Sequence, residues 1–101
     1  MASFLKVAAV SELPPGGAKV VEAQGKEIAL FNVNGSLYAL DNLCPHAGGP
    51  LAEGTVQEDA IECPWHGACF NLKTGKSSSP LADDVSAYPV RVAGSDIEIE
   101  L

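Results

Sequence analysis

All the cysteines and histidines of this 101-residue chain lie in two short segments rich in glycine and proline, and this pattern constrains the fold more than any other feature. Three cysteines and two histidines fall between positions 44 and 69. The first segment reads CPHAGGP over 44–50, and the second reads CPWHGACF over 63–70. Neither can continue a regular strand, because proline donates no hydrogen bond to a ladder. We therefore expect two loops that carry ligating side chains.

The rest of the sequence predicts an all-β fold. Residues 96–101 alternate acidic and aliphatic side chains, which is typical of a strand with one buried face. Asn34-Gly35 separates two apolar runs and predicts a hairpin, because both residues tolerate a positive φ. This regular pattern breaks between about 42 and 72. There we expect a small ligand-binding subdomain, with a short hairpin over 55–62 holding the two loops side by side.

Length and composition predict one domain over 1–101. The charge, hydropathy and N-terminus that follow predict that it stays in the cytoplasm. The formal net charge is −7, with 13 acidic against 6 basic residues, which argues against nucleic acid or an anionic membrane as a partner. No apolar run approaches the roughly 18 residues of a spanning helix. The N-terminus also lacks the basic-then-apolar order of a signal peptide. In such a protein an odd number of cysteines favours ligation chemistry over disulfides.

The candidate metal site consists of Cys44-x-His46 and Cys63-x-x-His66, with 16 residues between His46 and Cys63. Two thiolates and two imidazoles suit either a tetrahedral zinc or an iron–sulfur cluster. The glycines of both segments let the backbone come close, so that amide N–H groups can point at sulfur. These neighbours favour the cluster, and a zinc-stabilised structural module is the alternative.

In these two motifs the sequence resembles the Rieske family of 2Fe–2S proteins, which pair a C-x-H with a later C-x-x-H. The resemblance extends from the Asn34-Gly35 hairpin to Tyr88-Pro89-Val90. In size and layout the chain is similar to a stand-alone Rieske-type ferredoxin. The resemblance implies an antiparallel β-sandwich or barrel, with a cluster-binding subdomain at about 42–72 inserted between its strands.

The same resemblance implies that Cys44 and Cys63 bind one iron of a single 2Fe–2S cluster as thiolates, while His46 and His66 bind the other as neutral imidazoles. It implies a monomeric one-electron carrier rather than an enzyme. Its partners would be a flavoprotein ferredoxin reductase and the terminal oxygenase of a bacterial ring-hydroxylating system. With both histidines so used, the chain has none left for a 2-His-1-carboxylate iron site. The alternative is a small Rieske-type subunit of a larger redox enzyme, such as assimilatory nitrite reductase.

Mixed ligation implies a reduction potential between about −150 and +300 mV. High-potential family members carry two further cysteines, a serine and a tyrosine near the cluster. The matching positions here hold Gly49, Trp65, Ala68 and Phe70, so the resemblance implies the low end of this range. We expect Cys69 to be a small packing residue rather than a third thiolate or a redox switch. Trp65 is either a contact for a redox partner or a lid over the cluster.

Overall fold

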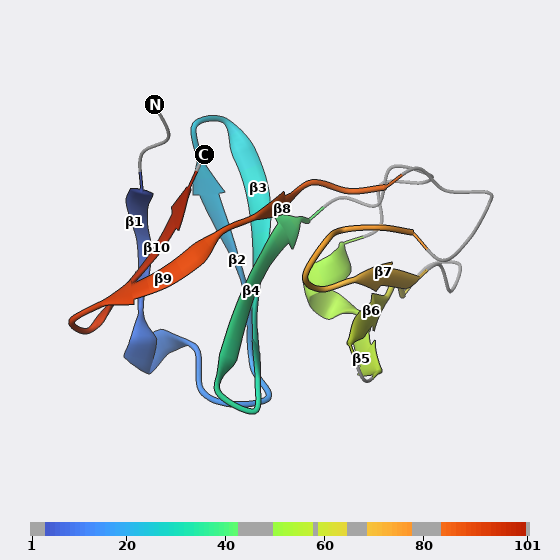
Figure 1. The fold of residues 1–101 in the computed structure, drawn as a ribbon, viewed down its shortest axis with the longest axis horizontal. Helices are drawn as coiled ribbons and strands as arrows, with labels where there is room; N and C mark the ends of the chain where they lie inside the picture. The colour runs from blue at the N-terminus through green and yellow to red at the C-terminus, as the bar shows by residue number, and fades with distance from the viewer. Residues whose placement is uncertain (1–3, 43–49, 58, 65–68, 78–83, 101) are drawn as a thin grey trace.

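The structure is a computed structural model, which describes residues 4–42, 50–57, 59–64, 69–77 and 84–100 (Figure 1). Its elements in chain order are β1 (Phe4–Ala9), η1 (Val10–Glu12), β2 (Ala18–Ala23), β3 (Lys26–Val33), β4 (Ser36–Asp41), η2 (Leu51–Glu53), β5 (Thr55–Gln57), β6 (Ala60–Glu62), β7 (Cys69–Asn71), β8 (Ala87–Tyr88), β9 (Val90–Ala93) and β10 (Asp96–Glu100). Both helical elements are 3-10 turns, and every strand pairing is antiparallel. The all-β prediction is therefore confirmed for the described part of the chain.

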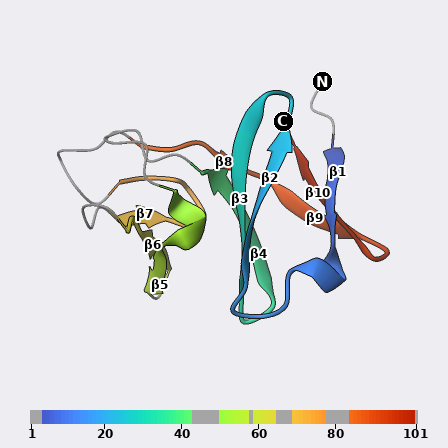
Figure 2. The ribbon, with the colours of Figure 1, turned by 180° about the vertical axis from the view of Figure 1, so that it is seen from behind.

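Two sheets form the base of the molecule. One has the order β1-β10-β9 and the other the order β2-β3-β4-β8. Figures 1 and 2 show the first sheet lying across one face of the second. Between them is an apolar core to which both sheets contribute, made of Ala8, Leu13, Val21, Ile28, Leu30, Ala39, Ile97 and Ile99. Ile97 and Ile99 are fully buried, as the alternation over 96–101 predicted.

The Asn34-Gly35 hairpin is also confirmed. Both residues have positive φ, 55° at Asn34 and 93° at Gly35, and they join β3 to β4. Asn32 holds this turn, because its Oδ1 accepts a hydrogen bond of 2.9 Å from the backbone N–H of Gly35. Its Nδ2 donates to the carbonyl of Leu13 at 2.9 Å, which ties the turn to the loop before β2.

A third, smaller sheet of order β5-β6-β7 stands beside the base, next to the outer face of the four-stranded sheet (Figures 1 and 2). Its β5–β6 pair is the hairpin predicted over 55–62. A second apolar core joins it to the base through Ala29, Phe31, Leu40, Leu51, Ile61, Cys63, Phe70, Leu72 and Val85. This core fixes the small sheet to β3 and β4 of the base.

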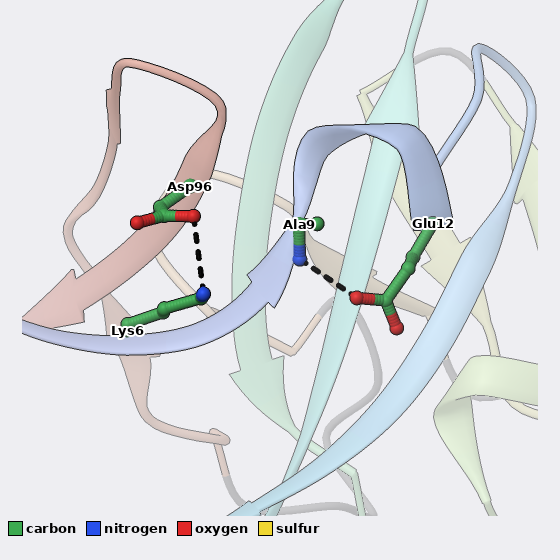
Figure 3. A network of polar contacts seen from close by, with 4 residues as sticks. All are labelled: Lys6, Ala9, Glu12 and Asp96. Atoms are coloured by element: carbon green, nitrogen blue, oxygen red, sulfur yellow. Dashed lines mark hydrogen bonds and ion pairs between the residues drawn. The ribbon is translucent and has the colours of Figure 1, made fainter.

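Exposed polar contacts lie at the edge of the base away from the small sheet (Figure 3). Lys6 Nζ pairs with Asp96 Oδ1 at 3.2 Å, linking β1 to β10. The backbone N–H of Ala9 donates to Glu12 Oε2 at 2.9 Å and so caps η1. This hydrogen bond, together with the ammonium of Lys19, lowers the pKa of the Glu12 carboxyl. Such exposed pairs add little stability, because water screens them.

Candidate iron–sulfur site

The flanks of the two cysteine–histidine motifs meet at one end of the small sheet. Thr55 of β5 lies opposite Glu62 of β6, and Glu62 in turn lies opposite Cys69 of β7. The start of β5, the end of β6 and the start of β7 are therefore neighbours. The first motif leads into β5 through η2, and the second connects β6 to β7. Both motifs consequently join the sheet at this end. The loops over 43–49 and 65–68 lie outside the described residues, so their placement side by side stays a prediction.

Gly54 makes this juxtaposition close. It follows η2, and a Cβ added to it would lie 2.1 Å from the carbonyl oxygen of Glu62, a distance that no side chain tolerates. The chain leaving the first motif therefore lies against the residue just before Cys63. Nothing in the sequence pattern singled out Gly54. Its φ of −78° is open to any residue, so close approach rather than backbone conformation requires glycine here.

Asn42 links the two sides of the first motif. It directly follows β4 and is 2% exposed. Its backbone carbonyl accepts a hydrogen bond of 2.7 Å from Leu51, and its Oδ1 accepts one of 3.0 Å from the N–H of Ala52. Its backbone N–H donates to the carbonyl of Glu27 at 3.0 Å, while its Nδ2 donates to Glu27 Oε1 at 3.2 Å. Asn42 thus holds together β3, the end of β4 and η2. The sequence pattern did not single out this residue either.

Asp41 precedes Asn42 in the sequence. It binds the segment 84–88, where the chain returns from the small sheet to the base. Tyr88 Oη donates to Asp41 Oδ1 at 2.6 Å, and the N–H of Ser86 donates to Asp41 Oδ2 at 3.2 Å. Burial raises the pKa of Tyr88 to about 12, and its hydrogen bond to the negative charge of Asp41 adds to the shift. At the end of β4, Asp41 therefore binds the segment 84–88 and Asn42 binds η2.

Cys63 is the one predicted ligand within the described residues. It follows β6, is 1% exposed and belongs to the core that joins the small sheet to the base. Its thiol is thus shielded from water at the end of the sheet where both motifs join. Pro64, the next residue, is exposed, so the chain turns outward directly after the cysteine.

The other predicted site residues lie outside the described part of the chain, and for these the expectations stay predictions: Cys44, His46, Gly49, Trp65, His66 and Ala68. Cys69 starts β7 and is partly buried, beside a cleft of about 360 Å³ that Lys76 and Asp59 also line. Phe70 is fully buried in the core.

Comparison with known proteins identifies the family. Residues 3–89 match the family model of the Rieske 2Fe-2S domain. The chain belongs to the Rieske family. The 3-phenylpropionate/cinnamic acid dioxygenase ferredoxin subunit of Shigella boydii serotype 4 (strain Sb227) is 45% identical to this Rieske protein over 94 residues, which are 91% of this chain and 88% of that relative.

Two solved structures share the Rieske fold closely. In the complex of reduced oxygenase and oxidized ferredoxin in carbazole 1,9a-dioxygenase, one chain is 35% identical with a TM-score of 0.84, covering 95% of this chain and 91% of that one. A structure from Mycobacterium tuberculosis, assigned as an NADH-dependent nitrite reductase small subunit, is 25% identical with a TM-score of 0.90, covering 100% and 96%. The fold is thus common to both groups, and sequence identity is higher with the ferredoxins.

This Rieske protein is accordingly an electron-transfer component of the ferredoxin type and not a catalytic oxygenase, and its domain binds one 2Fe–2S cluster. The family match also removes the zinc-stabilised module as an alternative. The described residues fit such a cluster. Cys63 offers a soft thiol ligand in a dry, apolar setting, and both motifs join the sheet beside it.

Proposed function

We propose that this protein is the ferredoxin of a ring-hydroxylating dioxygenase system, which takes electrons one at a time from a flavoprotein reductase and delivers them to the terminal oxygenase. The observation that carries the proposal is the 45% identity to a dioxygenase ferredoxin subunit over 91% of this chain. The carbazole dioxygenase complex supports it, because there a related ferredoxin is bound to its oxygenase.

We propose Cys44, His46, Cys63 and His66 as the ligands, within one domain over 1–101 whose cluster-binding subdomain covers about 42–72. The motif spacing supports this assignment, as does the meeting of both motif flanks at one end of the small sheet. When bound, the cluster supplies reversible uptake of one electron, in a potential range that its two neutral imidazole ligands raise.

The work of the chain itself is to hold these ligands and to keep water away from them. Cys63 sits among fully buried side chains of Leu51, Ile61 and Phe70. A dry environment disfavours the extra negative charge of the reduced state, and backbone N–H groups directed at sulfur offset part of that cost. Neither Ala68 nor Phe70 has a hydroxyl to add such a donor. This supports a potential at the low end of the range.

A nitrite reductase small subunit is the other function that the fold allows. The match to that structure is 25% identical, against 45% for the dioxygenase ferredoxin subunit. The sequence holds all four proposed ligands, two cysteines and two histidines, which also favours an electron-carrying ferredoxin over a nitrite reductase small subunit. We propose a monomer in the cytoplasm, and the net charge of −7 argues against nucleic acid or an anionic membrane as its partner. Within the described residues no helix is long and apolar enough to cross a bilayer.

Electron transfer to purified partners tests the proposal. The protein is reduced under anaerobic conditions and mixed with the terminal oxygenase of a 3-phenylpropionate-type dioxygenase, or with the catalytic subunit of a nitrite reductase. We expect rapid reoxidation by the oxygenase and slow reoxidation by the nitrite reductase. The opposite preference would overturn the proposed function and favour the second candidate.

A further inference from the structure

The four hydrogen bonds of Asn42 connect the two ends of the segment 43–50 to the base of the fold. On one side, Glu27 of β3 binds both the backbone N–H and the side-chain Nδ2 of Asn42. On the other side, Leu51 and Ala52 of η2 donate to its carbonyl and its Oδ1. The residue that comes before the segment is therefore bonded directly to the residues that follow it.

An uncharged amide is required at this position. Its side chain donates to a carboxylate oxygen and accepts from a backbone N–H at the same time, and both partners are fixed by neighbouring elements. Alanine supplies neither bond. A carboxylate can accept from Ala52 but cannot donate to Glu27 while ionised. Asn42 itself is buried, so a polar group at this position that lacks a partner is not compensated by water, whereas the exposed Glu27 carboxylate stays solvated.

We propose that Asn42 is a positioning residue for the iron–sulfur site: by bonding β3 to η2, it fixes where the segment that carries the first ligand pair begins and ends. This inference rests on the proposed ligands Cys44 and His46, which that segment carries. Asn42 is not one of the proposed ligands. Its effect is transmitted through η2 and Gly54, whose backbone lies against the carbonyl of Glu62, the residue before Cys63.

The test uses the cluster-loaded protein and a reversed hydrogen bond. Asn42→Ala removes both side-chain bonds, and Asn42→Asp keeps the acceptor but loses the donor. Combining Asn42→Asp with Glu27→Gln restores a donor–acceptor pair in the opposite sense and leaves the total charge unchanged. Glu27→Gln alone completes the cycle. Three quantities are measured for each variant: iron loss to an excess of chelator, the midpoint potential, and the EPR g-values of the reduced protein.

Asn32 supplies a matched control. It is also a buried asparagine that donates one side-chain hydrogen bond and accepts another, but it lies at the opposite end of the β3–β4 hairpin. Asn32→Ala therefore reports the cost of losing a buried amide of the base. We expect it to lower the melting temperature while leaving the potential and the g-values as in the wild type.

We expect Asn42→Ala and Asn42→Asp to lose iron about tenfold faster than the wild type, the factor that follows from loss of a buried hydrogen bond. We expect altered g-values in both and a lower potential in Asn42→Asp, with the reversed pair close to the wild type in all three readouts. If Asn42→Ala does not fold, the inference is decided by comparing the double variant, Asn42→Asp with Glu27→Gln, with Asn42→Asp alone. If the double variant loses iron as fast as Asn42→Asp alone, or if the Asn42 variants match Asn32→Ala, the inference is wrong. A wild type that holds no cluster would instead overturn the proposed function and this inference with it.

Discussion

At the scale of single residues, the site depends on a few polar groups at the end of β4. Asp41 receives hydrogen bonds from Tyr88 and Ser86, and Asn42 binds β3 and η2. Each of these groups is bonded to a partner distant in sequence. Individual bonds of this kind contribute about 0.5–3 kcal/mol, with the larger values for charged partners. The end of β4 therefore depends on contacts that only the folded chain brings together.

Burial of Tyr88, together with its hydrogen bond to Asp41, predicts a particular alkaline response. The pKa of Tyr88 is about 12 in the folded protein, against about 10 for an unfolded tyrosine, so the folded state holds this proton more tightly. Its contribution to stability is complete below pH 10 and is lost as the pH rises towards 12. We expect Tyr88→Phe to lose less stability than the wild type over this interval, measured by urea unfolding at successive pH values. Tyr38→Phe is the aromatic control, and a Tyr88→Phe profile parallel to the wild type would contradict the prediction.

The two cysteines within the described residues, Cys63 and Cys69, predict opposite outcomes. Cys63→Ser replaces a proposed ligand with a poor one and places a hydroxyl in an apolar core. We expect that variant to lose the visible absorbance of the cluster. Cys69→Ser changes a cysteine outside the proposed ligand set, so we expect its spectrum to match the wild type. Retention of a normal spectrum by Cys63→Ser would refute the ligand assignment.

At the scale of elements, the small sheet is held by packing against β3 and β4 on one side and by close backbone contact on the other. Gly54→Ala should force the chain after η2 away from Glu62 and cost about 1–3 kcal/mol of unfolding free energy, as overpacking does. Gly94→Ala, in a hairpin with open space around it, should cost only the smaller penalty of a positive φ. Urea unfolding measures both, and equal losses would show that the contact at Gly54 is not restrictive.

Much of the element order was predictable because its signals are local. Asn34-Gly35 marks its own turn, and the alternation of Ile97 and Ile99 with acidic residues marks the buried face of β10. The roles of Asn42 and Gly54 were not predictable in this way. Both depend on partners brought close by the fold: Glu27 lies 15 residues from Asn42, and Gly54 needs to be glycine only because Glu62 is opposite. A single sequence carries no sign of such contacts.

At the scale of the whole molecule, net charge affects how fast the protein meets a partner. A net charge of −7 attracts a basic partner over a distance that salt shortens. We therefore expect the second-order rate of electron transfer to the oxygenase to fall as ionic strength rises, in stopped-flow measurements at increasing sodium chloride. A rate that is constant or rises with salt would show that net charge does not steer this association.

The central claim is that two cysteines and two histidines hold one 2Fe–2S cluster in a one-electron carrier. The most direct test is the EPR spectrum of the purified protein after reduction with dithionite. We expect a red-brown protein that bleaches on reduction and gives a rhombic signal whose average g lies below that of four-cysteine ferredoxins. A colourless, EPR-silent protein with bound zinc, or a signal typical of four-cysteine ligation, would contradict it.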